Sequence, residues 1–222
     1  MPIFIDFRLL ELSMDLGTLE RHFSRIEEEI ARGEETANQE LKDKWQALEF
    51  KDEAEWDLLR QERDFQLEFV LPRVLRCPFL VTLFTVYETA VTEIAKHIQD
   101  KRGLRISFDD LRGGLLSRAR KYYANVLDFE LSKSNRHWER ITLLSDLRNA
   151  IAHRNGRLDL MSPGVGEKLL KIDGVSESFG YIVVDENFLR ETFTLVKEEL
   201  EGLVARYKQW DTEHRAWLQA EG

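Results

Sequence analysis

The residues of this chain that are best suited to chemistry stand together in the stretch LRNAIAHRNG, residues 147–156. Arg148 carries a rigid fork of donors that matches the oxygens of a phosphate group. Histidine is the residue type best suited to transferring protons near neutral pH, and His153 supplies one. Asn149 and His153 are four residues apart, so on a helix they share one face. Together these side chains could form a site that handles phosphate.

A structural role would account for the same residues. His153 and Arg154 would occupy the last turn of a helix, where the helix dipole favours positive charge, and Gly156 would end that helix. Arg148 and His153 are five residues apart, about 140° around a helix, so within one chain the two side chains diverge. A short spacing of Arg and His also arises by chance, so the surrounding sequence has to separate the two interpretations.

The charge of the chain is unevenly distributed. The 222 residues carry a net charge of −9, but residues 101–157 contain thirteen Lys and Arg against six Asp and Glu. This segment therefore has a charge of +7, and the remainder has −16. An asymmetry of this size favours a local anion-binding surface on an acidic body, although solvated charges alone would give the same pattern.

Composition limits the classes of protein to consider. A hydrophobic content of 43% with 33% charged residues is typical of a soluble globular protein, and the single cysteine, Cys77, excludes an intrachain disulfide. The N-terminal sequence does not resemble a signal peptide, and the most apolar stretch, residues 79–87, is too short to cross a bilayer. We therefore expect a cytoplasmic protein with no membrane partner. No Cys and His spacing fits a zinc site, and no Gly-rich phosphate loop is present, so neither metal nor cofactor is expected.

Helices are expected to position the candidate residues, since only four prolines and twelve glycines interrupt the chain. Apolar residues at helical spacing predict amphipathic helices over residues 7–31 and about 35–70, separated at Gly33 and joined as an antiparallel hairpin. Pro72 should end or kink the second helix. The further predictions are an apolar core helix over about 78–101, a turn capped by Ser107, helices over 115–128 and from near Ser134 to Gly156, a β-hairpin of residues 169–172 and 181–184, and a last helix over about 186–218.

These elements predict an all-α fold. An N-terminal antiparallel helical hairpin would span residues 1–72, and a helical bundle with a minor β-hairpin before its last helix would span residues 73–222. Trp45 and Trp56 are large apolar groups on an otherwise charged helix and need cover. We therefore expect the helical hairpin to brace the bundle, to strengthen dimerisation or to bind a partner.

The stretch from Arg148 to His153, Arg-Asn-Ala-Ile-Ala-His, resembles the Arg-polar-x-x-x-His signature of the HEPN superfamily. The preceding TVYETAVTEIAKHI, residues 85–98, resembles the long first helix of that bundle, including an acidic residue, Glu88, in mid-helix. The segment DGVSESFGYIVVDENFLRETF, residues 173–193, resembles the part that leads several bacterial HEPN proteins into their last helix. The resemblance covers about residues 75–205, so the N-terminal hairpin lies outside it.

The resemblance implies a metal-independent endoribonuclease that acts as a homodimer, often as a toxin or an antiviral defence component with an antitoxin or other regulatory partner. RNA carries its own nucleophile, the 2′-hydroxyl, and its cleavage needs a base, an acid for the leaving 5′-oxygen and positive charge beside the phosphorane. His153 would transfer the protons, and Arg148 would bind the phosphate. Asn149 would orient the imidazole or hold a phosphate oxygen. These three are the candidate catalytic residues.

Further residues are expected to contact the RNA backbone because they carry, or can carry, positive charge in the basic segment. They are Arg154, Arg157, Arg140, His137, Arg120 and Lys121, and Glu88 would support the site. His137 also fits a simple surface role. Two other functions stay open at this point. One is a non-catalytic dimeric scaffold or nucleotide-binding protein of the same fold, and the other is an interaction protein whose helical hairpin captures a partner helix.

Overall fold

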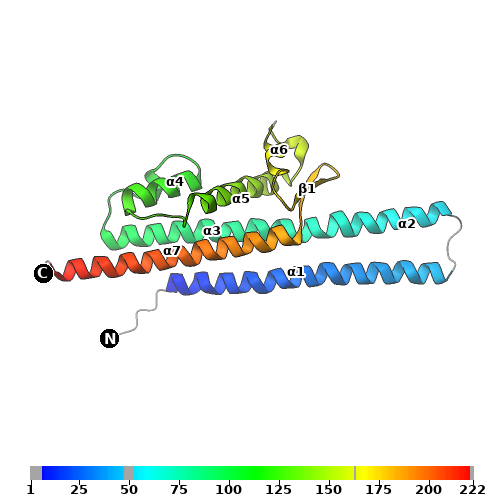
Figure 1. Cartoon of the computed structure of the whole chain (residues 1–222), viewed down its shortest axis with the longest axis horizontal. Helices are drawn as coiled ribbons and strands as arrows, with labels where there is room; N and C mark the ends of the chain where they lie inside the picture. Colours follow the sequence, from blue (N-terminus) through cyan, green and yellow to red (C-terminus); the bar gives the residue numbers. More distant parts are fainter. Residues whose placement is uncertain (1–6, 48–52, 163, 221–222) are drawn as a thin grey trace. The chain divides into compact units, whose positions relative to one another are not determined.

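The structure is a computed structural model that describes residues 7–47, 53–162 and 164–220. Helices make up most of it, with one small antiparallel sheet (Figure 1). In chain order the elements are α1 (Phe7–Gln46), α2 (Glu53–Phe65), the π-helical turn η1 (Gln66–Val70), α3 (Leu71–Arg102), the 3-10 turn η2 (Phe108–Asp110), α4 (Leu115–Tyr122), the π-helical turn η3 (Tyr123–Leu127), α5 (Asn135–Arg154), the 3-10 turn η4 (Leu158–Leu160), α6 (Val165–Leu169), β1 (Val175–Ser178), β2 (Tyr181–Val184) and α7 (Glu186–Ala220). The predicted fold class, all-α with a minor β-hairpin before the last helix, is confirmed.

The described residues fall into two compact units. Of the described residues, unit 1 consists of 7–17, 82–146 and 192–220, and unit 2 consists of 18–47, 53–81, 147–162 and 164–191. The three candidate catalytic residues therefore belong to unit 2. The predicted division of the chain at residue 72 stays a prediction.

Helix α1 runs without interruption through Gly33, where we predicted a break. That prediction is wrong because one glycine inside a helix costs only about 1 kcal/mol relative to alanine. Gly33 allows a close approach instead: a Cβ atom at this position would lie 2.7 Å from Cδ2 of Leu71. The turn of the helical hairpin therefore falls between Gln46 and Glu53, and residues 48–52 lie outside the described part of the chain.

Pro72 does not end the helix in which it lies, so that part of the prediction is wrong, whereas the alternative, a kink, stays a prediction. The turn η1 connects α2 to α3, and the backbone N–H of Leu71 bonds to the carbonyl of Gln66, five residues back. A proline removes one helical hydrogen bond and crowds the carbonyl four residues before it. A π-helical turn just before the proline changes the register of these bonds, so the helix continues past Pro72 as α3, which also contains Pro78.

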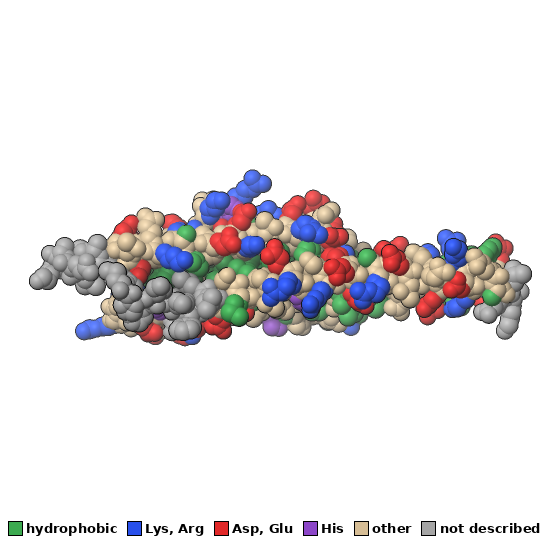
Figure 2. All heavy atoms as spheres, turned by 90° about the horizontal axis from the view of Figure 1, so that it is seen from below, with side chains coloured by type: hydrophobic (Ala, Val, Ile, Leu, Met, Phe, Trp, Pro, Cys, Tyr) green, Lys and Arg blue, Asp and Glu red, His purple; other side chains and the backbone are tan. Residues whose placement is uncertain are grey.

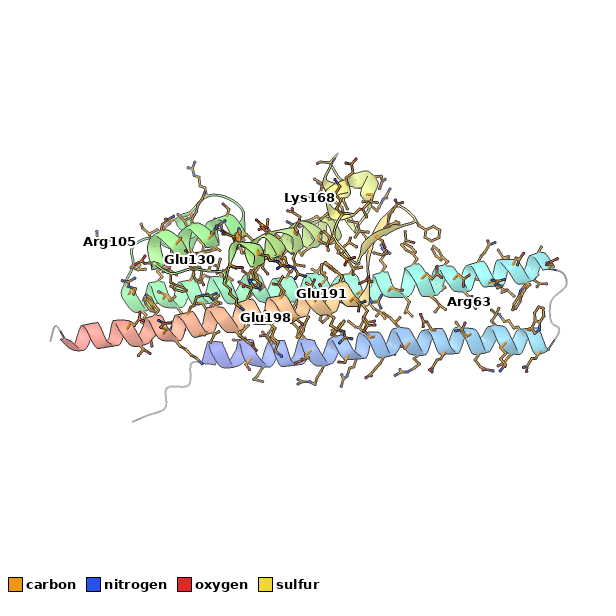
Figure 3. All side chains as sticks on the ribbon, in the orientation of Figure 1. Arg63, Arg105, Glu130, Lys168, Glu191 and Glu198 are labelled. Carbon is orange, nitrogen blue, oxygen red and sulfur yellow. The ribbon has the colours of Figure 1, made fainter. Side chains whose placement is uncertain are left out.

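Within unit 2 the two arms of the helical hairpin are antiparallel. Residue numbers fall along one arm as they rise along the other in four contacts: Trp45 with Trp56, Asn38 with Arg63 (Figure 3), Glu27 with Arg76 and Phe23 with Phe79. The rings of Trp45 and Trp56 lie 4.7 Å apart, so each gives the other part of its cover. Figure 2 shows acidic and basic side chains interspersed along the face of the molecule on which α1 lies.

An ion pair between Glu27 and Arg76 joins these two arms. Arg76 donates from Nε and Nη2 to the two carboxylate oxygens at 2.9 and 2.6 Å, and the side chains are only 13% and 14% exposed. Burial lowers the pKa of Arg76, but the hydrogen bond and the charge of Glu27 raise it, and the resulting pKa lies above its ordinary value.

We expect Glu27→Ala to lower the free energy of unfolding by roughly 3 kcal/mol, because it leaves a nearly buried guanidinium without its carboxylate. Glu29→Ala is the matched control, since the side chains of the Glu29–Arg32 pair are 56% and 67% exposed and such pairs contribute less than about 1 kcal/mol. Urea denaturation of both variants measures the difference. Equal losses in the two variants would contradict the expectation.

The small sheet differs from the prediction in its first strand. Strand β2 has the predicted residues, but β1 is Val175–Ser178, whereas residues 169–172 form the end of α6 and the turn after it. A short apolar run can be either a strand or a buried helical turn, and Leu169 is fully buried at the end of α6.

The predicted cap at Ser107 is present: its backbone N–H donates to the Asp110 carboxylate at 2.8 Å.

Among the described residues, one continuous helical stretch, Glu53–Arg102, is long and apolar enough to cross a membrane by length and composition. The core helix of a soluble protein can meet the same criteria, and Leu80, Leu83 and Phe84 near the middle of this stretch are completely buried. The expected absence of a membrane partner therefore stays a prediction.

Candidate functional site

The candidate catalytic residues lie on the last two turns of α5. Leu147, Ala150 and Ile151 are buried, and these apolar positions fix which side of the helix faces the core. Asn149 and His153 are both exposed, as expected for two residues that share the opposite face. The helix therefore presents an amide and an imidazole to solvent one turn apart.

Arg148 is bonded to its neighbour in the motif, Asn149. It is half-buried, and its Nη1 donates to Oδ1 of Asn149 at 2.9 Å. This bond uses one of the two acceptor sites of the Asn149 amide oxygen, and the amide N–H groups remain donors for a ligand. The Arg148–Asn149 pair is therefore a set of donors, which suits an anion.

His153 and Arg154 end the helix with available polar groups. No residue in the described ranges forms a hydrogen bond or an ion pair with either side chain. An imidazole with both nitrogens open can accept a proton on one and give a proton from the other. Arg154 is half-buried, and its charge is available to a bound anion.

The segment after α5 is attached to the β-hairpin by backbone bonds. Asn155 and Gly156 both have left-handed backbone angles, with φ of 52° and 72°, so the chain turns sharply at the glycine that we predicted to end the helix. The Gly156 N–H donates to the Ala150 carbonyl at 3.1 Å, and the Gly156 carbonyl accepts from the Ile182 N–H at 2.8 Å. The end of α5 is therefore held on strand β2.

Arg157, a predicted RNA contact, is engaged within the chain. Its guanidinium donates to both carboxylate oxygens of Asp159, at 3.0 and 2.6 Å. The hydrogen bond from Arg157 lowers the pKa of Asp159, and the same bond raises the pKa of Arg157. Asp159 therefore neutralises part of the positive charge beside the motif. In contrast, no carboxylate among the described residues forms an ion pair with His153 or Arg154.

The other predicted RNA contacts and Glu88 belong to unit 1. Arg140 and Lys121 are exposed, and Glu88 is half-buried in α3. The ring of His137 is tied to the start of α5, because its Nδ1 lies 2.9 Å from Oγ of Ser134. Their assignment to an RNA surface stays a prediction.

Arg120 lines a cavity of about 290 Å³ in unit 1. Its guanidinium lies 5.4 Å from the centre of the Trp138 ring and donates to Asn135 at 3.2 Å. The complete lining is Arg120, Glu130 (labelled in Figure 3), Leu131, Ser132, Lys133, Ser134, Asn135 and Trp138. Of these residues, Arg120 was predicted from the sequence, whereas Lys133 and Trp138 were not. The run Ser-Lys-Ser-Asn a few residues before Trp138 is nevertheless a signal for a polar loop at a helix start.

The loop that forms this cavity is held by two charged side chains of α7. The Lys133 N–H donates to Oε1 of Glu199 at 3.3 Å, and Nη2 of Arg206 donates to the Leu131 carbonyl at 2.7 Å. Glu199 is buried, and its carboxylate lies 3.8 Å from Nδ1 of His137. Burial first, and then the negative charge of Glu199, raises the pKa of the Tyr87 hydroxyl. This buried polar cluster was not predictable from the sequence, because nothing in the local sequence distinguishes Glu199 from an exposed helical glutamate.

The thiol of Cys77 is a further candidate nucleophile. Cys77 is a buried free cysteine, and burial raises the pKa of its thiol to about 11 against the opposing charges of Arg73 and Arg76. A thiol held in the protonated form is a poor nucleophile. Among the described residues, no group of three or more His, Cys, Asp and Glu side chains is placed to hold a metal ion.

No protein-family model, no curated protein and no solved structure matches this chain. The class that the fold defines is therefore an all-α protein with a two-stranded antiparallel sheet. Membership of the HEPN superfamily stays a prediction from the residues quoted above.

Proposed function

We propose that this chain is a metal-independent endoribonuclease whose site is built from Arg148, Asn149 and His153. The observation that carries the proposal is the exposed, unbonded imidazole of His153 on the same helix face as an amide that Arg148 has oriented as a donor. A proton-transfer group beside donors for an anion is the combination that phosphodiester cleavage by a neighbouring hydroxyl requires.

In the proposed reaction the neutral imidazole of His153 takes the proton of the RNA 2′-hydroxyl. The 2′-oxygen attacks the adjacent phosphorus, the bond to the 5′-oxygen of the next nucleotide breaks, and an imidazolium gives a proton to that leaving oxygen. Arg148 and the amide N–H groups of Asn149 bind the phosphate oxygens as their negative charge rises. The products are a 2′,3′-cyclic phosphate and a 5′-hydroxyl.

A second copy of the chain would complete this chemistry. The reaction uses one base and one acid, and the motif supplies one histidine per chain. Arg148 and His153 also diverge around α5. A two-fold contact that places the two α5 helices near the axis would bring both copies of His153 to one site, and such a symmetric contact is the commonest form of dimer. The proposed active form is therefore a homodimer.

If the active form is a homodimer with a shared site, a dimer of one active and one inactive chain should not cleave RNA. Mixing wild type with a ninefold excess of His153→Ala should leave about a tenth of the wild-type chains in wild-type pairs if subunits exchange at random. Cleavage per wild-type chain should therefore fall about tenfold. Light scattering should report a dimer at micromolar concentration. Unchanged cleavage per wild-type chain after full subunit exchange, or a monomer by light scattering, would reject the shared site.

The direct test of the proposed function is an RNA-cleavage assay of the wild-type chain beside His153→Ala in the presence of EDTA. Cleavage by the wild type alone supports the ribonuclease. Absence of cleavage, or equal cleavage by both chains, would favour a non-catalytic protein in which His153 and Arg154 only complement the carbonyl end of α5.

A further inference from the structure

The tip of the β-hairpin holds a large aromatic side chain in solvent. Ser178 pairs with Tyr181, so the turn consists of Phe179 and Gly180, whose φ angles are 52° and 79°. A two-residue turn with both angles positive favours Asn-Gly, and a bulky residue at its first position is strained. Burial does not compensate, because Phe179 is 67% exposed. A strained residue that stays largely exposed is a reason to look for a function.

Phe179 belongs to a small aromatic cluster within unit 2. Its ring meets the ring of Phe65 edge-on at 4.9 Å and lies 5.2 Å from that of Phe69. Phe65 is 37% exposed, whereas Phe69 is buried beneath them. The cluster therefore presents two accessible aromatic rings on a fixed base.

A cation completes the cluster. The guanidinium of Arg73 lies 4.4 Å from the centre of the Tyr181 ring and 5.5 Å from that of Phe69. No carboxylate in the described ranges forms an ion pair with Arg73. Its orientation is set by the aromatic rings, and its charge remains available to an anion beside them.

Backbone bonds attach this cluster to the end of the candidate catalytic helix. The Leu158 N–H donates to the Gly180 carbonyl at 3.0 Å, and the Ile182 N–H donates to the Gly156 carbonyl at 2.8 Å. Arg157 and Tyr181 pair as an isolated antiparallel bridge. The turn that carries Phe179 is therefore fixed to residues that follow His153 and Arg154 within a few positions of the chain.

We propose that Phe179 and Phe65 form a base-stacking subsite for single-stranded RNA, with Arg73 binding a phosphate next to the stacked base. The proposal rests on the proposed ribonuclease function, because it assigns the ligand from the neighbouring His153 motif. Aromatic rings accept every base through its π-face, so the subsite tolerates sequence variation. It requires unpaired bases, because bases in a duplex are already stacked on each other. The substrate class is therefore a single-stranded region, a loop or an end.

Binding of a fluorescently labelled single-stranded RNA to the full-length His153→Ala chain tests the subsite without cleavage. Phe179→Ala and Phe179→Leu should each weaken binding about tenfold, whereas Phe179→Tyr should bind as the parent does. Phe65→Leu, on α2 and outside the strained turn, should also weaken binding. Leu58→Ala is the control, because Leu58 is 65% exposed but is not aromatic. Thermal melts of every variant establish that the fold is retained.

A paired measurement assigns the effect to stacking. If a base stacks on Phe179, an RNA in which abasic sites replace the bases should bind the parent weakly, and Phe179→Ala should weaken it no further. Parent-like affinity of Phe179→Leu would overturn the subsite. The subsite would also be overturned if Phe179→Ala lost its oligomeric state but kept its RNA affinity. The aromatic rings would then contact another copy of the chain and not RNA.

The subsite and the proposed function can fail separately. If the wild-type chain cleaves RNA but Phe179→Leu and Phe65→Leu bind it normally, the subsite is wrong and the ribonuclease stands. If RNA binding depends on Phe179 in a chain that cleaves nothing, the subsite stands and the ribonuclease is wrong. If the His153→Ala and wild-type chains both bind no single-stranded RNA, both proposals are wrong.

Discussion

Replacing His153 with alanine is expected to lower RNA cleavage at least about 100-fold, the typical loss when a general acid or base is removed. The side chain is exposed and forms no bond within the described residues, so its removal should leave the stability of the fold unchanged. His22→Ala is the matched control, since His22 is an exposed histidine in the same compact unit. It should cleave as the wild type does.

The same assay separates the role of Arg148. Arg148→Ala should lose a similar factor, because the charge of the phosphorane is then not balanced. Arg148→Lys should recover part of the activity, since lysine restores the charge without the forked geometry. Arg148 is half-buried, so a thermal melt must accompany both variants. Full activity in both His153→Ala and Arg148→Ala would favour the scaffold interpretation.

A single 2′-deoxynucleotide on the 5′ side of the cleaved bond is expected to stop cleavage at that bond. The proposed nucleophile is the 2′-hydroxyl of the RNA, and no other group of the RNA or the protein takes its place in the proposed reaction. DNA of the same sequence should likewise remain intact. A metal-dependent nuclease would activate water instead and would not need this hydroxyl. Gel analysis of an RNA with one defined deoxy position gives the answer, and cleavage at that position would contradict the mechanism.

Elements with strong periodicity were predictable from the sequence, whereas breaks inside them were not. The last helix begins at Glu186, as predicted. At Gly33, however, local propensity favours an interruption that the structure does not make, and at Pro72 it favours a helix end where the structure has a π-helical turn followed by more helix. A glycine can serve close packing, as Gly33 does against Leu71, and a π-helical turn can accommodate a proline. Neither the close packing at Gly33 nor the π-helical turn before Pro72 can be recognised from the local sequence.

The candidate site was predictable only in part for the same reason. The types and spacing of Arg148, Asn149 and His153 are local, so the sequence identifies them. The contacts that surround them come from distant segments. Phe179 becomes an exposed ring beside Phe65 only because the chain folds back on itself. The first strand was predicted over residues 169–172, too early in the chain to place Phe179 in the turn of the β-hairpin. Glu199 reaches the loop of Lys133 across 66 residues of sequence.

The chemistry of the products tests the central claim most directly. A defined single-stranded RNA is incubated with the wild-type chain in EDTA, and the fragments are analysed by mass spectrometry. The account predicts fragments that end in a 2′,3′-cyclic phosphate and begin with a 5′-hydroxyl, formed by the wild type and absent with His153→Ala. Fragments with a 5′-phosphate, or cleavage that EDTA abolishes, would contradict it.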